Sequence, residues 1–369
     1  MENEYSWLLI LSGLASGVTL GFIVQRSRFC MTAIVSNYVL LRDVRQLHTY
    51  FIAILLAISG VFFLEYSGIV SIMDSSYRSP NIQWFSVMFG GLIFGIGAVM
   101  AGGCIGRILT LTGEGNLSAL LALLAICLSA TVVYTGLLEP IRVWAYQIAV
   151  IQTDDNSIIS LFDIPSWMVA ISLILLCITL IRLSYKNHMD LNLLLTGLGL
   201  GLLVVVGWWV TGRLATDEFS TARPTSLTFS GPLVNASLFI TVASEPKNLF
   251  GLMLVAGTVL GSFISAICSG RFRIMPLSPD SFIRVFNGGL LMGIGATMAG
   301  GCNIGQGLSG LSTLSLESIL AVICIFAGMY AGIKWLQYKE SHKPVWVEIC
   351  EHFKYPIKNP IKYFRTISH

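Results

Sequence analysis

The chain has 369 residues, of which 55% are apolar and only 11% are charged, and its mean hydropathy is +0.78. This composition excludes an ordinary soluble globular protein and is typical of a polytopic membrane protein. The formal net charge of +3 is small, so we expect no nucleic-acid partner. The apolar composition predicts that the surface contacts a lipid bilayer.

Nine uncharged or nearly uncharged apolar runs approach the length that crosses about 30 Å of hydrocarbon. In chain order they are residues 7–24, 50–64, 84–104, 117–138, 164–181, 191–211, 249–268, 285–302 and 318–336. A tenth run, residues 227–243, is short and contains Pro232, so we predict a re-entrant segment there. The predicted fold is an all-α polytopic membrane protein of about nine transmembrane helices plus short re-entrant helices.

The basic residues predict the orientation of the chain, because Lys and Arg near the ends of spans mark the cytoplasmic side. Three connections are basic, residues 26–45, 182–186 and 271–284, and the tail after residue 334 is rich in Lys. Residues 139–163 carry three aspartates against one arginine. We therefore expect an external N-terminus, a cytoplasmic C-terminus and an odd number of spans. No cleavable signal peptide is predicted, because Glu2 and Glu4 stand where a basic leader would be.

One segment occurs twice, as GGLIFGIGAVMAGGC at residues 90–104 and GGLLMGIGATMAGGC at residues 288–302. Twelve of the fifteen positions are identical, and the offset is 302 − 104 = 198 residues. With the orientation above, the repeat predicts two halves of opposite orientation, as in many carriers. We assign residues 1–150 to the first inverted repeat, 151–190 to a connecting span and cytoplasmic link, 191–338 to the second repeat and 339–369 to a basic cytoplasmic tail.

Glycines have two predicted roles in this repeat. Six of them are expected to make close helix contacts in the membrane: Gly91, Gly95, Gly97, Gly289, Gly293 and Gly295. The paired glycines that end each run differ, because they let the backbone leave helical geometry and free amides beyond them favour an anion. Irregular backbone at membrane depth is tolerated where it lines a cavity. We therefore expect Gly103, Cys104, Gly301 and Cys302 to lie on a solute path.

A third cysteine belongs with these two. Cys30 follows the first span, and the 198-residue offset makes Thr228 its counterpart, so the set is three thiols and one alcohol. A thiol is a weak, polarisable donor, which suits a large soft anion that must bind and also leave. Redox chemistry is the competing use, but the sequence shows neither a resolving partner nor a neighbouring base.

The remaining five cysteines are expected to be packing residues; they are Cys127, Cys177, Cys268, Cys324 and Cys350. None of the cysteines forms a CxxC pair, so neither a disulfide scaffold nor a metal or cofactor site is predicted.

Polar side chains near the predicted path are the remaining candidates. Arg28, with its neighbour Arg26, could receive an anion at the cytoplasmic mouth, although positive charge on the cytoplasmic side explains both equally well. Arg223 lies on the predicted external side, where an anion would arrive. Asn303 and Gln306 offer amide donors next to the second tip, or cap a helix.

Two tryptophans near the end of a span, Trp208 and Trp209, are predicted to belong to an interfacial aromatic belt.

Three segments resemble the YeeE/YedE sulfur-transport family: QRSRFCM at residues 25–31, MAGGC at 100–104 and MAGGCNIGQGLSG at 298–310. The resemblance follows the whole chain in order and length. It implies an inner-membrane carrier shaped as an hourglass of inverted halves with short dipping helices. It also implies that thiosulfate passes along Cys30, Cys104 and Cys302, and that a small TusA-like sulfur-carrier protein acts on the cytoplasmic side. The first tip departs from the family at Arg107, where relatives carry a small polar run, which leaves the exact solute open.

The leading hypothesis is a transporter rather than an enzyme. It takes up thiosulfate or a closely related sulfur anion across the bacterial inner membrane, from Cys302 near the external side to Cys30 and Cys104 nearer the cytoplasm. The alternatives are a carrier of a selenium species or another soft anion, a membrane thiol redox enzyme, and a passive structural subunit.

Overall fold

The computed structural model describes residues 2–148, 150–153, 155–161, 165–186, 190–214, 223–242, 248–277 and 279–341. The predicted tail beyond residue 341, with Cys350, lies outside these residues, as do Asp154, Asp163 and His188. The described chain is almost entirely helical. Its regular strands are the antiparallel pair β1 (Asn81–Ile82) and β2 (Ile151–Gln152).

Each of the nine predicted spans corresponds to a long helix. They are α1 (Glu2–Ser27), α3 (Arg45–Tyr66), α4 (Trp84–Ala101), α6 (Leu117–Tyr134), α9 (Ser166–Lys186), α10 (Leu191–Leu214), α12 (Leu249–Cys268), α13 (Pro279–Met298) and α14 (Leu316–Ser341). Seven helical segments of the described chain are long and apolar enough to cross a membrane. The two helices that do not reach this standard are α9, whose apolar part is Trp167–Cys177, and α13, which contains Arg284 and Asn287. The all-α polytopic fold class is thus confirmed.

Seven short elements join the long helices. Four of them follow a break in the chain: α2 (Met31–Leu41), α5 (Ile105–Gly113), α11 (Ser230–Val242) and the π-helix η2 (Gly305–Gly310). The others are η1 (Ser76–Arg78), α7 (Glu139–Gln147) and α8 (Ile158–Leu161). The fourth span was predicted to reach residue 138 but ends at Tyr134, because the chain turns there into the polar helix α7.

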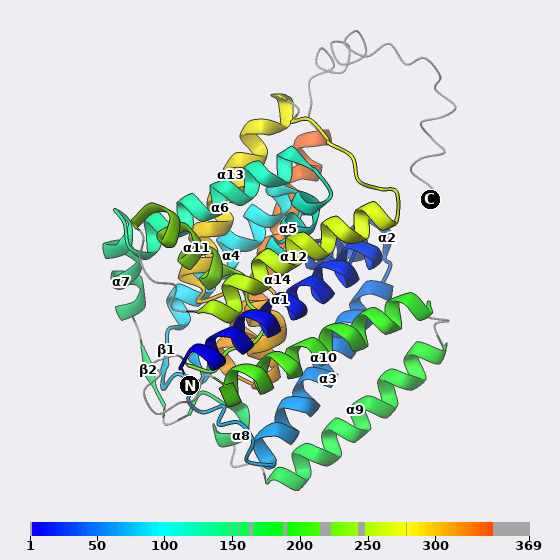
Figure 1. The fold of residues 1–369 in the computed structure, drawn as a ribbon, viewed down its shortest axis with the longest axis vertical. Coiled ribbons are helices and arrows are strands. Elements are labelled where there is room, and N and C mark those ends of the chain that lie inside the picture. The colour runs from blue at the N-terminus through cyan, green and yellow to red at the C-terminus, as the bar shows by residue number, and fades with distance from the viewer. Residues whose placement is uncertain are drawn as a thin grey trace.

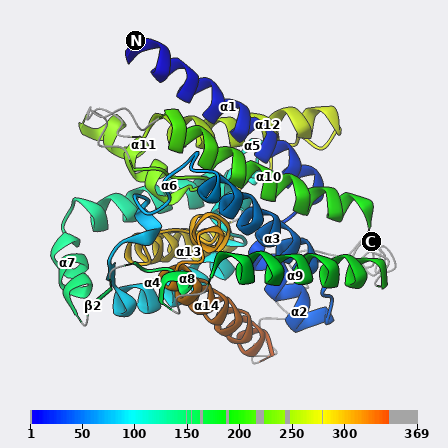
Figure 2. The same cartoon turned by 90° about the horizontal axis from the view of Figure 1, so that it is seen from below.

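The helices of the second half follow the order of the first. Adding 198 residues brings α1 to α10, α2 to α11, α3 to α12, α4 to α13, α5 to η2 and α6 to α14. The packing has the same symmetry. The pair α1 and α12 corresponds to the pair α10 and α3, and the pair α6 and α13 corresponds to the pair α14 and α4. The helices α4 and α13, which are each other's counterparts, pack together. Figure 1 shows α1 between α12 and α10, and Figure 2 shows α4 and α14 on the opposite side of the molecule. The opposite orientation of the two halves relative to a membrane stays a prediction.

The repeated glycines hold α4 and α13 together. A Cβ on Gly97 would lie 2.7 Å from the Met292 nitrogen, and one on Gly295 would lie 2.4 Å from the Phe94 nitrogen. Because Gly90, early in α4, meets Ala299 just after α13, and Gly288 meets Ala101 at the end of α4, the two helices run antiparallel. The remaining predicted packing glycines lie against two other helices: Gly91 and Gly95 against α14, Gly289 and Gly293 against α6. The packing role predicted for these glycines is confirmed.

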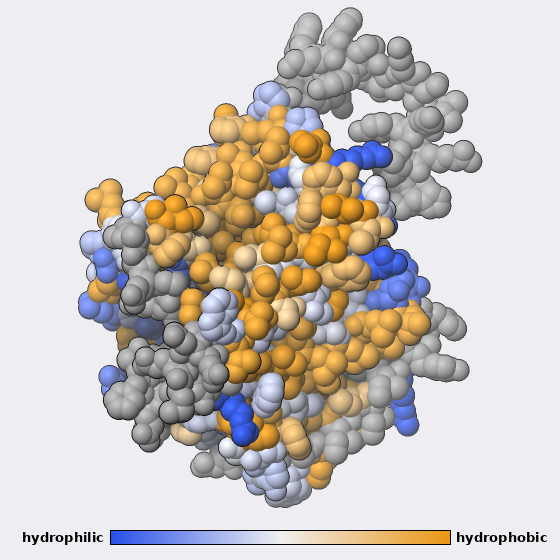
Figure 3. All heavy atoms as spheres, in the orientation of Figure 1, coloured by the Kyte–Doolittle hydropathy of each residue, from blue (hydrophilic) through white to orange (hydrophobic). Residues whose placement is uncertain are grey.

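The two ends of the molecule carry different side chains. Figure 3 shows a broad hydrophobic band over the face formed by α1, α10 and α12. We call one end the Arg28 end. It contains the turn between α1 and α2 and the turn after α5, where the Glu114 carbonyl accepts a hydrogen bond from the Arg273 amide. At the other, the Arg78 end, Arg78 donates to Glu65 over 2.8 Å and lies 3.9 Å from Asp155. The strands and the N-terminus of α1 are at this second end (Figure 1).

Candidate functional site

The two GGC segments end their helices in the same way. Gly102 and Gly300 are left-handed, with φ of 86° and 65°, a conformation that glycine adopts without a steric penalty. The next amide of each tip, at Gly103 and Gly301, donates 2.9 Å back to the carbonyl five residues earlier. The sequence therefore stops both helices just before Cys104 and Cys302, as predicted.

Cys30 and Cys104 lie together although they are 74 residues apart in the chain. Their sulfur atoms are 3.7 Å apart, and the residues are only 5% and 2% exposed. Cys30 is the N-cap of α2 and Cys104 the N-cap of α5, so each thiol sits beside backbone amides that the helix leaves unpaired. The pair therefore combines soft sulfur with the positive end of two helices, and it supplies the neighbouring thiol that the sequence did not reveal.

Cys302 begins the second cluster. It is fully buried, and its sulfur accepts the Gly305 amide over 3.4 Å. A Cβ on Gly305 would lie 2.8 Å from the Thr228 hydroxyl oxygen and 3.3 Å from the Tyr77 hydroxyl oxygen. Thr228, the predicted counterpart of Cys30, thus lies beside η2 just as Cys30 lies beside α5.

Asn303 is a buried side chain near the thiols whose polar atoms are both unpaired. It is 2% exposed, and neither its amide nitrogen nor its amide oxygen has a hydrogen-bond partner. It neighbours the Cys104 thiol without a hydrogen bond of normal geometry, and it faces a narrow apolar void beside Met31 and Tyr50. A buried amide that is left unpaired at both ends costs stability, so Asn303 is a candidate for a role other than packing.

An apolar contact separates the two thiol clusters. A Cβ on Gly106 would lie 2.7 Å from Cδ1 of Ile304 and 3.4 Å from the ring of Phe229. Ile304 is 4% exposed and Phe229 is fully buried. The side chain of Ile304, two residues beyond Cys302, therefore fills the space over Gly106, two residues beyond Cys104.

Gln306 is held by the protein itself. Its amide nitrogen donates to the Ala299 carbonyl over 2.9 Å, and its amide oxygen accepts the Ser318 hydroxyl over 2.6 Å. Its stem lies against Gly301, where a Cβ would be 3.0 Å away. Because both polar atoms of its amide are hydrogen-bonded within the protein, Gln306 stabilises the second tip. Of the two predicted amide donors, only Asn303 has unpaired atoms.

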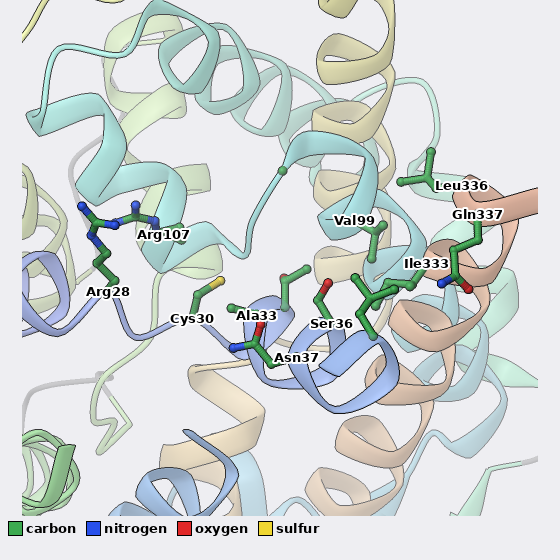
Figure 4. A pocket seen from close by; sticks show the side chains of 13 residues that line it. Arg28, Cys30, Ala33, Ser36, Asn37, Val99, Arg107, Ile333, Leu336 and Gln337 are labelled. Atoms are coloured by element: carbon green, nitrogen blue, oxygen red, sulfur yellow. The ribbon is translucent and has the colours of Figure 1, made fainter. Parts of the chain in front are cut away.

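A cavity of about 580 Å³ opens beside Cys30 at the Arg28 end. Figure 4 shows the side chains of Arg28 and Arg107 reaching the same part of this cavity. Arg28 has a left-handed backbone with φ of 53°, and Arg107 lies one turn beyond Cys104. Arg26 is exposed and does not line the cavity, and Arg223 is exposed on the segment before α11.

Three residues at the site, Arg107, Tyr77 and Trp208, were not predicted there from the sequence. Arg107 could have been suspected because a cation in the first turn of a helix opposes the helix dipole. Tyr77 and Trp208 carry no such signal. Trp208 was predicted to lie in an aromatic belt, but it is fully buried and its Nε1 donates to the Ser312 hydroxyl over 3.0 Å. Its neighbour Trp209, at 47% exposed, fits the belt.

Tyr77 stands edge-on to Trp208, with ring centroids 6.1 Å apart. Burial raises the pKa of the Tyr77 phenol above its usual range, so this hydroxyl stays protonated and can donate.

Fold and site together define a multi-pass membrane protein in which buried thiols lie at breaks between helices, an arrangement typical of transporters. The sulphur transport family matches residues 26–331, and the chain belongs to this family.

Among its relatives is the thiosulfate transporter TsuA of Escherichia coli K12, which is 28% identical over 355 residues, or 89% of this chain and 95% of the relative. Thiosulfate transporter TsuA of Spirochaeta thermophila is 29% identical over 346 residues, or 90% and 100%. A probable transporter of Xylella fastidiosa is 33% identical over 76 residues, or 20% of this chain and 56% of the relative.

Proposed function

We propose that this protein takes up thiosulfate or a closely related sulfur anion by relay along Cys30, Cys104 and Cys302. The observation that carries the proposal is the buried Cys30–Cys104 pair, with sulfur atoms 3.7 Å apart at the starts of two short helices. Backbone amides supply partial positive charge at the thiols themselves, and thiols are soft, weak donors. Such a site binds a soft anion and still releases it.

The relay begins at Cys302 and ends at the Cys30–Cys104 pair. Thr228, Tyr77 and the Gly305 amide surround Cys302 with hydroxyl and N–H donors. Asn303, whose amide is unpaired, lies between this cluster and Cys104. The order of these groups supports a path in which the solute always has a donor within reach.

The direction of transport follows from the orientation. We place the Arg28 end in the cytoplasm, the N-terminus outside, and the two halves in an inverted arrangement within the bacterial inner membrane. The basic residues of the turns at the Arg28 end support this orientation, and the antiparallel packing of α4 on α13 supports inverted halves. The relatives named as thiosulfate transporters support both the solute and a transporter rather than an enzyme.

Uptake of radiolabelled thiosulfate into cells that lack other sulfur routes tests the proposal. Cys30→Ala, Cys104→Ala and Cys302→Ala should each lower uptake at equal protein levels. Cys324→Ala, which removes a buried thiol on α14, serves as the matched control and should transport as the unaltered protein does. Unchanged uptake in all three pathway variants would refute the relay. Competition by selenite and other soft anions ranks the alternative solutes.

The thiol pair also gives the redox alternative a specific observation, since the two sulfur atoms, 3.7 Å apart, are in direct contact. A thiol redox enzyme needs Cys30 and Cys104 but not Cys302, and it accumulates a disulfide or mixed disulfide during turnover. Mass spectrometry of rapidly alkylated protein separates the two functions, because the relay leaves all three thiols reduced.

A TusA-like carrier protein remains the proposed cytoplasmic partner. Co-purification of such a protein with the full chain, and its loss when the Arg28 end is altered, tests this assignment.

A further inference from the structure

The cavity at the Arg28 end has charges of one sign. Its charged lining residues within the described chain are Arg28 and Arg107, and no carboxylate lines it. The carboxylate of Glu114 lies 3.4 Å from the Arg107 guanidinium, from outside the lining. Glu114 thus offsets the charge of Arg107, whereas Arg28 has no ion-pair partner among the described residues, which leaves net positive charge at the cavity that attracts anions.

A buried hydroxyl without a partner lies in the same cavity. Thr32 lines it and is 9% exposed, and its hydroxyl oxygen has no hydrogen-bond partner. A buried polar group without a partner is unusual. In a cavity whose charge is positive, the matching partner is an anion oxygen that accepts a hydrogen bond from the hydroxyl.

The backbone adds a further sign of a built site. Arg28 holds a φ of 53°, which is disfavoured for a residue with a Cβ and is found mainly where the surrounding structure requires it. This turn places the exposed Arg28 side chain at the opening of the cavity (Figure 4).

We propose that this cavity is a second anion site, in which Arg28, Arg107 and the Thr32 hydroxyl bind the oxygen atoms of a tetrahedral sulfur oxyanion. The site rests on the proposed function and deepens it, because Cys30 lines the same cavity. Thiosulfate has one soft terminal sulfur and three hard oxygens. Its sulfur faces the Cys30 thiol while its oxygens face the guanidinium groups, whose planar forks suit oxyanions. Sulfate, which has the oxygens but no soft sulfur, binds this cavity and does not pass the thiols.

Equilibrium binding of radiolabelled sulfate to the purified full-length protein tests the site. Arg28→Gln and Arg107→Gln should each weaken sulfate binding about 10- to 100-fold, the effect of losing one charge-assisted hydrogen bond. Arg26→Gln is the matched control, since it removes an equal charge two residues from Arg28 but outside the cavity, and it should leave binding within about twofold. Absence of sulfate binding by the unaltered protein, or equal losses in all three variants, overturns the proposal.

Two further variants keep the test decisive if Arg107→Gln fails to fold. Glu114→Gln leaves Arg107 in place and removes its recorded counter-charge, so sulfate should bind more tightly. A purely structural role for this ion pair predicts weaker or unchanged binding, which contradicts the site. Thr32→Val keeps the shape of the side chain and removes the unpaired hydroxyl, so sulfate affinity should fall while thermal stability does not.

The outcome is independent of the relay. Cys302→Ala should abolish thiosulfate uptake and leave sulfate binding unchanged, because Cys302 does not line the cavity. Normal uptake with Cys302→Ala refutes the relay and leaves the sulfate measurements to decide the cavity. Loss of sulfate binding with Cys302→Ala shows instead that sulfate binds in the thiol path, and the separate site is wrong.

Discussion

Gly90→Ala tests whether the contact between α4 and α13 positions the cysteine tips. A Cβ on Gly90 would lie 2.4 Å from the Ala299 nitrogen and 2.8 Å from the Gly295 carbonyl oxygen. Real Cβ contacts essentially never fall below 3.0 Å, so the backbones of α4 and α13 must separate here by at least 3.0 − 2.4 = 0.6 Å. No flexible side chain can give way instead, because both neighbours are backbone atoms. Since Ala299 is three residues before Cys302, we expect this separation to move the second tip.

We expect Gly90→Ala to lower stability by about 1–3 kcal/mol, the usual cost of overpacking, and to expose the Cys302 thiol. The mirror variant Gly288→Ala would place its Cβ 2.4 Å from the Ala101 nitrogen, so it should expose Cys104 instead. The assay is the rate of maleimide labelling of each cysteine, read by mass spectrometry, beside the thermal midpoint in detergent.

Gly231→Ala is the matched control, because a Cβ there meets no atom within 4 Å. It should label and melt as the unaltered protein does. If Gly90→Ala and Gly288→Ala behave like this control, or if each exposes the cysteine of its own helix instead of the partner's, then the glycine contact does not position the tips.

Three further predictions concern buried polar side chains. Asn303→Leu should raise stability by about 1 kcal/mol, because two unpaired amide atoms are removed, and should reduce uptake; lower stability with normal uptake would show that the amide is structural. Arg78→Gln should destabilise by about 3 kcal/mol because it strands the partly buried Glu65 carboxylate, and adding Glu65→Gln should recover part of the loss in thermal unfolding. Trp208→Phe should cost about 1 kcal/mol through its lost bond to Ser312, and an unchanged melting temperature would contradict that.

The parts of this fold that the sequence predicts are those that depend on local pattern. Apolar length predicts the long helices, and glycine pairs at residues 102–103 and 300–301 predict where two of them stop. The repeat offset also places Thr228 beside the second tip, because two halves with the same element order bring equivalent positions into equivalent surroundings.

Contacts between segments that are far apart in the sequence could not be predicted in the same way. The offset relates Cys104 to Cys302, yet Cys104 touches Cys30, because the short helices α2 and α5 bring their starting ends together. Trp208 illustrates the same limit. A tryptophan near a span end is usually interfacial, but here a hydroxyl on a distant segment satisfies its N–H and allows full burial.

One pair of equivalent positions, Gly106 and Ile304, carries different residues in the two halves and lies between the thiol clusters. Under the 198-residue offset the counterpart of Gly106 is Ile304, and the structure places these two positions in contact. A glycine at both positions would leave a gap between the thiol clusters, and an isoleucine at both would not fit, since a single Cβ on Gly106 already approaches Ile304 to 2.7 Å. One side chain therefore closes the space that both halves share. Under the proposed relay, an anion that moves from Cys302 to Cys104 passes this contact, and we propose that the Ile304 side chain forms the barrier that it must displace.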